Sequence, residues 1–364
     1  MEAWNEQLVS FELLISGFRR ACNATETIEK FIKVGNFIVC LQFAGEGLIP
    51  HILPAIAHLS IDKPIADPDL TICLWDTVST NIPISPLLDG LVQLIEHQRY
   101  EQLTPRQEIR LISNPRVPAT FAIWTGVFSM LDIKRNLAVY WINDATALPY
   151  HEKSAPLRTI LNWWLNTHNH QCVHAAAVGT KDGGVLITGK SGSGKSTTAL
   201  ACLDSDLLYA SDDYCLITSD PIPYAYSLYN TAKLNGEADI QRQPHFRSMI
   251  CNPEQVGQDK LMMFMEKHLP HKLSLGFPLR AILVPKVMEN TATPQVESTL
   301  QRVSGAIALR ALAPTSMCQL PGTQQSSFSN MVKLIKQLPC YQLKLGSNIP
   351  AIPQTIIGLL SNGR

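Results

Sequence analysis

A glycine-rich loop constrains the fold of this 364-residue chain more than any other feature of its sequence. Residues 189–196 read GKSGSGKS and match G-x-x-x-x-G-K-[ST] at every fixed position, between the apolar run 185–188 and a segment of helix-forming composition. The glycines of such a loop let backbone N–H groups converge on phosphate oxygens at the start of the next helix. An ordinary Gly/Ser turn is the alternative, but it does not explain the flanking strand and helix. The sequence therefore predicts a nucleotide-binding loop in an α/β domain.

The loop motif also predicts which side chains meet the nucleotide. Lys195 is expected to reach the terminal phosphates, and the hydroxyl of Ser196 is expected to bind Mg²⁺. The residues predicted to contact the nucleotide are Gly189, Ser191, Gly192, Ser193, Gly194, Lys195, Ser196 and Thr197.

Two adjacent carboxylates follow the loop. Asp212 and Asp213 stand within LLYASDDYCLI, a largely apolar segment that is predicted to form a strand. Neighbouring side chains of a strand point to opposite faces, so the two carboxylates have different roles unless the strand ends there. One is a candidate ligand of Mg²⁺ and the other is a candidate proton acceptor for an attacking hydroxyl. A solvated Asp-Asp turn is the alternative.

The chain is long enough for two domains, and its 46% hydrophobic residues fall in the globular range. Short β-type runs with alternating or apolar character fill the region from 36 to 142, with a predicted helix over 86–98. The pattern changes near residue 150, where a helix is predicted over 155–168. We therefore predict an α+β module over 1–150 and a nucleotide-binding domain over 151–364. The β-type runs of the first region are at 36–43, 70–76, 107–113, 120–124 and 127–142. In the second region a strand is predicted at 278–287, and helices are predicted at 304–313 and 328–338.

The charge balance and the cysteines indicate the kind of partner and the cellular compartment, and they point to no particular reaction. Thirty basic residues balance thirty acidic ones, which argues against nucleic acid as the main partner. No window approaches 18 uninterrupted apolar residues, so no membrane span is expected. The nine cysteines are scattered singly, without a CxxC pair or zinc-ligand spacing, which favours free thiols in a reducing compartment. A cytoplasmic protein is expected.

Three segments in order resemble one family. VHAAAV (173–178), LITGKSGSGKSTTAL (186–200) and YASDDY (209–214) resemble the HPr kinase/phosphorylases and the wider set of HPr-kinase-like serine kinases. That family carries a histidine on the strand before a GxxGxGKS-type loop and a double aspartate shortly after it. The resemblance covers roughly 155 to 315. His174 on spacing alone is a core histidine of an apolar strand, and the resemblance instead implies a place beside the transferred phosphoryl group.

The resemblance implies a fold class, two cofactors and a set of roles. The fold would be a PEP-carboxykinase-type P-loop domain at the C-terminal end, preceded by a smaller β-rich domain. ATP and Mg²⁺ would be the cofactors, with Ser196 and Asp213 serving Mg²⁺ and Asp212 acting as the base. The implied catalytic residues are Asp212, His174, Lys195 and Arg280. The chain lacks the late acidic signature with arginine and glycine that accompanies dephosphorylating activity in the family. It therefore looks more like lasso-peptide precursor kinases.

The function expected from these features is a Mg²⁺-dependent ATP kinase that phosphorylates a hydroxyl, on a serine of a peptide or protein. A small-metabolite kinase and a non-catalytic ATP-dependent scaffold or regulator remain as alternatives. The N-terminal module is expected either to recognise a substrate or to form the interface of a homo-oligomer. The long irregular region 219–275 is a candidate lid or acceptor site. Its candidate side chains are Tyr224, Tyr226, Tyr229 and Lys233.

Overall fold

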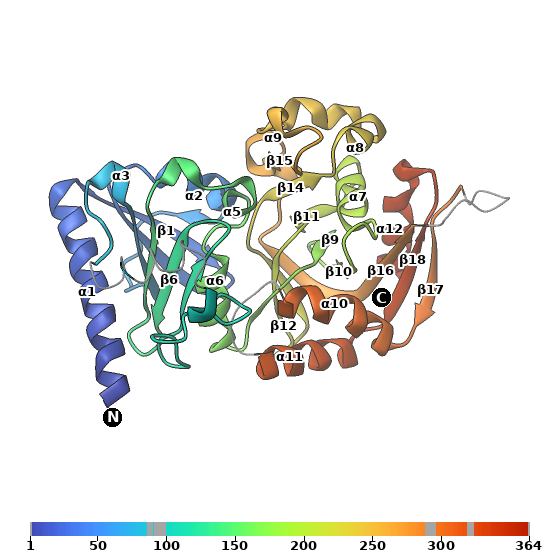
Figure 1. The fold of residues 1–364 in the computed structure, drawn as a ribbon. Helices are drawn as coiled ribbons and strands as arrows, with labels where there is room; N and C mark the ends of the chain where they lie inside the picture. Colours follow the sequence, from blue (N-terminus) through green and yellow to red (C-terminus); the bar gives the residue numbers. More distant parts are fainter. Residues whose placement is uncertain (1, 86–89, 91–99, 288–295, 319–323, 363–364) are drawn as a thin grey trace. The chain divides into compact units, whose positions relative to one another are not determined.

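The computed structural model describes residues 2–85, 90, 100–287, 296–318 and 324–362 (Figure 1). Contacts within the chain divide it into two compact units, with the division between His168 and Asn169. This division lies later than the boundary near 150 that the sequence pattern favoured. The reason is the helix α6 (Arg158–Asn166), which packs on strand β6 (Val127–Asp132) of the first unit and donates a hydrogen bond from the indole of Trp164 to Asn136. The helix expected over 86–98 lies outside the described residues, apart from position 90.

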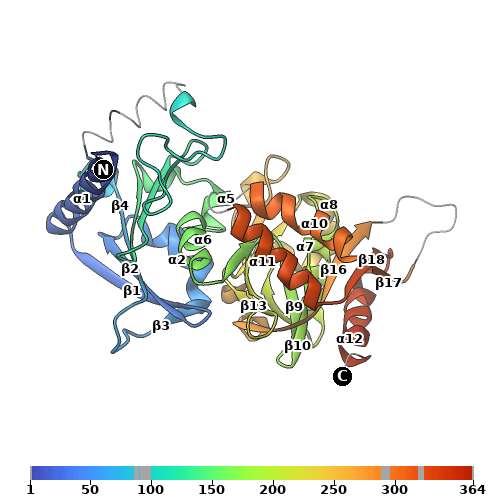
Figure 2. The same cartoon turned by 90° about the horizontal axis from the view of Figure 1, so that it is seen from below.

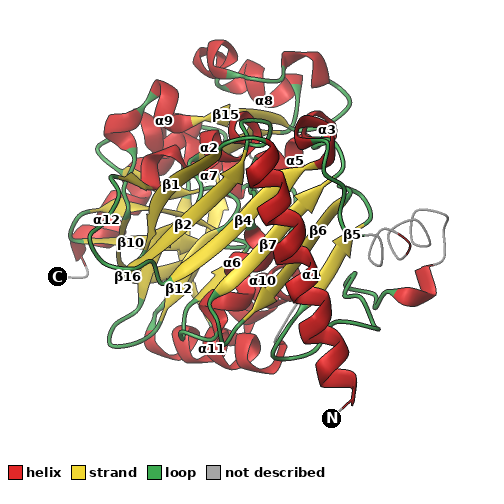
Figure 3. Cartoon of the chain, turned by 90° about the vertical axis from the view of Figure 1, so that its left-hand side faces the viewer, coloured by secondary structure: helices red, strands yellow, loops and turns green. Residues whose placement is uncertain are grey.

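The first unit is built on a seven-stranded mixed sheet with the order β3-β1-β2-β4-β7-β6-β5. Helix α1 (Glu2–Ala24) crosses one face of this sheet (Figure 3), where Phe11 and Leu14 pack in one apolar core with Trp75 and Phe128. The strands are β1 (Thr27–Val34), β2 (Phe37–Ala44), β3 (Ser60–Ile61), β4 (Leu70–Asp76), β5 (Ala119–Ala122), β6 and β7 (Leu137–Ile142). The short helices are α2 (Ile49–Ile56), α3 (Thr77–Thr80) and α5 (Tyr150–Lys153).

Most of the predicted strands of this unit are confirmed, but the one at 107–113 is wrong. Gln107 has a left-handed backbone (φ 66°), and the hydroxyl of Thr104 accepts hydrogen bonds from the N–H groups of Arg106 and Glu108. This turn chemistry competes with a regular ladder. Only isolated bridges therefore form in the described part of this segment, at Ile109 and Glu108.

The second unit is built around the long strand β16 (Gly276–Val287). Its middle residues pair in parallel with β10 (Gly183–Ile187) and its last residues with β18 (Cys340–Leu345), while its first residues pair antiparallel with β13 (Tyr224–Ser227). One strand therefore belongs to two groups of strands. The remaining members of the sheet are β8 (Gln171–Val173), β9 (Ala176–Thr180), β11 (Leu208–Ser211), β12 (Cys215–Thr218) and β17 (Thr299–Val303).

Helices cover both faces of this sheet. Alternate residues along β10 explain the layering, because Val185 and Ile187 pack toward α7 (Lys195–Ala201) and α12 (Ile352–Asn362), whereas Leu186 packs toward the other side. That other side carries α10 (Gly305–Cys318) and α11 (Gln324–Gln337), which lie next to each other in Figure 2. The apolar run before the glycine-rich loop is thus buried on both faces, as expected for a parallel strand.

A separate two-stranded ribbon, β14 (Thr231–Leu234) with β15 (Leu261–Phe264), lies within the region expected to be irregular. Between and after its strands come the short helices α8 (Glu237–Arg242) and α9 (Met265–His268). The region 219–275 is thus better ordered than its composition indicated. Its ribbon contacts α7, the helix that follows the glycine-rich loop.

Candidate active site

The glycine-rich loop leaves the end of β10 and enters α7 at Lys195. Gly192 (φ 76°) and Gly194 (φ 101°) have left-handed backbones that side chains disfavour, and a Cβ at 194 would overlap Cδ1 of Leu345. The hydroxyls of Thr188 and Ser193 are buried without a hydrogen-bond partner among the described residues. Buried hydroxyls of this kind can donate to an additional acceptor group, so the loop fits a phosphate.

The side chain of Lys195 folds back over its own loop. Its Nζ donates hydrogen bonds to the carbonyl oxygens of Gly189 (2.8 Å) and Lys190 (3.3 Å), and the residue is buried. Burial lowers the pKa of this ammonium, and the carboxylates Asp212 and Asp213 act in the opposite direction. The loop lysine and the two aspartates therefore share one electrostatic environment. Of the other loop positions, Ser191 is exposed while Ser196 and Thr197 are half-buried.

The two aspartates reach the loop because two neighbouring pieces of chain are interrupted at the same place. The apolar strand expected to carry His174 breaks into β8 and β9 at this residue, and the strand predicted over the double aspartate breaks into β11 and β12. The paired positions Val173 with Cys215 and Ala177 with Ser211 frame the interruption on both sides. Since both carboxylates lie where a strand ends, they are free of the strict alternation that would send them to opposite faces.

Asp213 is held by two cationic or protonatable groups. Its Oδ1 lies 2.7 Å from Nε2 of His174, and its Oδ2 lies 2.6 Å from Nζ of Lys233. Burial alone would raise the pKa of this carboxyl, but the charge of Lys233 and the hydrogen bond from His174 outweigh it and hold the pKa well below its usual range. Asp213 is therefore an anion with both oxygens occupied.

Asp212 has the opposite character. It is only 2% exposed, and its Oδ2 accepts a hydrogen bond from the backbone N–H of Lys233 (3.0 Å). Oδ1 has no hydrogen bond of normal geometry with any described residue, although the hydroxyl of Ser196 is near enough to lower the pKa. Burial and the charge of Asp213 outweigh that effect and raise the pKa of Asp212. The surroundings thus shift the pKa values of these two neighbouring carboxyls in opposite directions.

Lys233 was one of four side chains that the sequence placed in a possible lid, and the structure makes it part of the cluster. Strand β14 brings its ammonium to Asp213 and its backbone N–H to Asp212. Of the tyrosines proposed with it, Tyr224 and Tyr226 stack on each other on β13, with ring centroids 4.4 Å apart, and Tyr229 is 2% exposed. No sequence signal separated the lysine from the tyrosines, because its partner lies 20 residues away, between β11 and β12.

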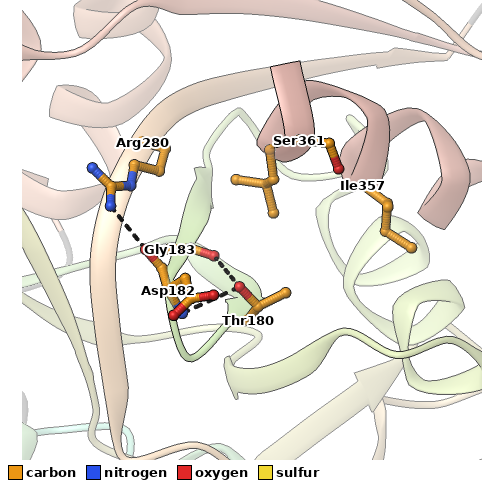
Figure 4. Close-up of a pocket in the computed structure, with 7 residues that line it drawn as sticks. Thr180, Asp182, Gly183, Arg280, Ile357 and Ser361 are labelled. Atoms are coloured by element: carbon orange, nitrogen blue, oxygen red, sulfur yellow. Dashed lines mark hydrogen bonds between the residues drawn. The ribbon is translucent and has the colours of Figure 1, made fainter. Parts of the chain in front are cut away.

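Arg280 does not join this cluster. It pairs into the first part of β16, beside the start of β10, and its guanidinium donates a hydrogen bond to the carbonyl oxygen of Asp182 (2.9 Å). The loop leaves the other end of β10, which at about 3.3 Å per residue is on the order of 15 Å away. Figure 4 shows Arg280 lining a cavity of about 370 Å³ with Gly183, Thr180 and residues of α12. The catalytic role expected for Arg280 therefore has no support from its position.

Mg²⁺ fits this donor set only with help from a nucleotide. Within the described ranges no group of three or more His, Cys, Asp or Glu side chains has the arrangement of a metal site. Mg²⁺ is commonly held by one or two protein oxygens together with phosphate and water oxygens. The hydroxyl of Ser196 beside Asp212 contributes to such a set, and each oxygen of Asp213, the other residue expected to serve Mg²⁺, already has one partner in His174 or Lys233.

Comparisons with known proteins give a faint similarity. No model of a protein family and no curated protein matches the chain. Among solved structures, the Hpr(Ser) kinase/phosphatase from Coxiella burnetii is similar over 53% of this chain and 97% of its own, at 14% identity and a TM-score of 0.30. Because a similarity of this size does not establish function, we base the proposed function on the side chains of this chain. In the described part of the chain, no helix has the length and apolar character that a bilayer crossing requires.

Proposed function

We propose that the chain is a Mg²⁺-dependent kinase that transfers the terminal phosphoryl group of ATP to a serine hydroxyl of a peptide or protein. The observation that supports this proposal is the pair Asp212 and Asp213 beside Lys195, with the pKa values of the two carboxyls displaced in opposite directions. Neighbouring carboxyls whose surroundings push their pKa values apart are typical of sites that divide acid-base work between them.

The reaction requires an attacking oxygen and a place for its proton. The acceptor hydroxyl forms a bond to the terminal phosphorus, the bond from that phosphorus to the oxygen of ADP breaks, and the hydroxyl proton passes to Asp212. Asp212 suits this step because its Oδ1 is unpaired and its pKa is raised. Asp213 stays ionised and keeps Lys233 and His174 in position around the reacting group.

The loop and its neighbours hold the donor. Lys195 leaves the loop carbonyls and binds the terminal phosphates, and the hydroxyls of Thr188 and Ser193 supply further donors. Ser196, with phosphate and water oxygens, is the residue of this chain that holds Mg²⁺, and Asp212 lies beside it. When bound, the cation neutralises charge on the phosphate oxygens. We propose that the PEP-carboxykinase-type core and the N-terminal module, which is expected to recognise a substrate or to form an oligomer interface, belong to the same enzyme.

Purified chain incubated with Mg²⁺, ATP labelled in its terminal phosphate, and panels of serine peptides and small metabolites tests the proposal. Asp212→Asn is expected to keep ATP binding and to lose transfer by about a hundredfold or more. Lys195→Met is expected to lose ATP binding itself, while Lys181→Gln, an exposed lysine on the β9–β10 turn, changes neither. Transfer that persists in Asp212→Asn removes the base assignment, and transfer to metabolites alone removes the peptide substrate.

A further inference from the structure

The ribbon of β14 and β15 has one face in the core and one face toward the site. Ala232 and Leu234 of β14 are members of the same core cluster as their cross-strand neighbours Met263 and Leu261. Cross-strand neighbours share a face and successive residues alternate, so Lys233 and Met262 occupy the opposite face. That face carries the side chain of Lys233 to Asp213.

A second lysine, Lys260, lies next to the end of this ribbon. Leu234 pairs with Leu261 as the last pair of the ribbon, and directly beyond this pair Asn235 and Lys260 line the same cavity. The buried amide of Asn252 fixes the backbone there, because its Nδ2 donates to the carbonyl oxygen of Lys260 (3.0 Å) and its Oδ1 accepts from the N–H of Met262 (2.7 Å). Only the side chain of Lys260 is then left to move.

Lys260 borders open space at the end of the ribbon. A cavity of about 320 Å³ is lined by Asn235, Gly236, Gly257, Gln258, Asp259 and Lys260. The side chain is exposed, and its charge acts on both the Lys195 ammonium and the Asp212 carboxyl, lowering the pKa of each. The charge of Lys260 therefore acts on both the loop lysine and the carboxyl proposed as the base.

The charges around this space do not balance. Lys195 donates to loop carbonyls and Lys233 pairs with Asp213, but the ammonium of Lys260 forms no ion pair with a residue that the structure describes. The charges of Lys195, Lys233 and Lys260 thus act around Asp212, whose pKa is raised, and Asp213, while Asp259 is the carboxylate that lines the cavity of Lys260. Such an arrangement favours an added anion with several negative charges.

We infer that Lys260 binds the terminal phosphate of the nucleotide from the side opposite the glycine-rich loop, so that the β14–β15 ribbon closes the donor site. This inference rests on the proposed function, since it takes the nucleotide to be a triphosphate held by Lys195. Lys260 acts on the group that is transferred, whereas the loop holds the whole phosphate chain. The lysine therefore discriminates ATP from ADP.

Equilibrium binding of ATP and of ADP to the full chain, each with Mg²⁺, tests the inference. Lys260→Gln is expected to weaken ATP binding about tenfold, the size of one lost charge-assisted hydrogen bond, and to leave ADP binding unchanged. Lys260→Arg keeps most of the ATP affinity because the positive charge remains. Lys267→Gln on α9, an exposed lysine of the same region, is the matched control and leaves both affinities unchanged.

Each outcome assigns the failure to one of the two proposals. The inference is overturned if Lys260→Gln loses ATP and ADP affinity equally, or if its ATP affinity is unchanged. A loss of ATP binding in Lys195→Met would then still show that the glycine-rich loop binds the nucleotide. If neither nucleotide binds the unaltered chain, the proposed function falls together with the inference. A retained far-ultraviolet circular dichroism spectrum excludes unfolding as the cause of a loss.

Discussion

Nε2 of His174 and Oδ1 of Asp213 lie 2.7 Å apart, across the place where two neighbouring lengths of strand are both interrupted. The other oxygen of Asp213 holds the ammonium of Lys233, so one carboxylate connects three segments that are far apart in sequence. Since the side chains of Asp213 and Lys233 are mostly shielded from water, the pair contributes more than an exposed ion pair would.

Replacing Asp213 by Asn is expected to lower the free energy of unfolding by about 3 kcal/mol, because the buried Lys233 ammonium loses its counter-charge. Urea denaturation at neutral pH measures the change. The matched control is Glu237→Gln, which removes the exposed partner of Arg247 and is expected to cost at most about 0.5 kcal/mol. Equal losses in the two variants would show that Asp213 behaves as a surface charge.

Acid should remove the contribution of Asp213. Its pKa in the folded chain lies well below the value of about 3.9 in an unfolded chain, so its stabilising effect is complete above that value and is lost as the pH falls toward the folded pKa. Below about pH 4 the stability of the unaltered chain should therefore fall more steeply than that of Asp213→Asn. Parallel pH profiles would contradict this assignment.

Asp212→Asn is expected to stabilise the chain at neutral pH while it removes transfer. Because the folded pKa of Asp212 is raised, stability due to this group is greatest below the unfolded pKa and declines as the pH rises through the folded value. A neutral amide avoids that cost, so the melting temperature should rise by a few degrees, a gain seen when a strained functional group is removed. A melting temperature below that of the unaltered chain at pH 8 would count against the raised pKa.

Substitutions of two glycines in the loop allow the cost of backbone strain and the cost of steric overlap to be measured separately. Gly192→Ala places a side chain in a left-handed conformation with open space around it, at a cost of about 1 kcal/mol. Gly194→Ala adds an overlap with Leu345 and is expected to cost about 3 kcal/mol in unfolding free energy. Thermal denaturation of the two variants compares these costs, and equal values would mean that Leu345 moves aside without penalty.

Arg280→Gln is expected to leave the affinity for ATP within about twofold of the unaltered value, because the exposed guanidinium bonds to Asp182 at the far end of β10. Equilibrium binding of ATP measures this. A loss comparable with that of Lys195→Met would restore Arg280 to the donor site and would require the chain to rearrange along β16.

The sequence predicts the local elements of the second unit well because their signals are local. The apolar run, the glycines and the helix-forming segment around Lys195 lie next to each other, and the strand at 278–287 contains the apolar run 281–284. The interruption at His174 has no such signal, since CVHAAAV is as apolar as an unbroken strand. It follows from pairing with a second interrupted segment, and periodicity does not report pairing.

Only the part of the site that has a local signal in the sequence was predicted. The motif located Lys195, and the double aspartate was singled out by its spacing, but the difference in pKa between Asp212 and Asp213 depends on their burial and on Lys233, which arrives from a ribbon. Arg280 shows the converse case. A basic residue of β16 was assigned to the site from sequence, and the structure places it beside the start of β10, whereas the loop leaves the end of β10.

The paired interruption has a consequence for how this chain can diverge. Three residues separate Val173 from Ala177, and three separate Ser211 from Cys215, so the two gaps match in length. An insertion in only one of these two segments would move His174 away from Asp213. Alternatively, it would shift the register of a strand by one residue, so that the buried face of the strand would point outward. Substitutions at these positions change the chemistry, but a change of length abolishes the site. Relatives that keep the site should therefore vary in side chains here and conserve both gap lengths together.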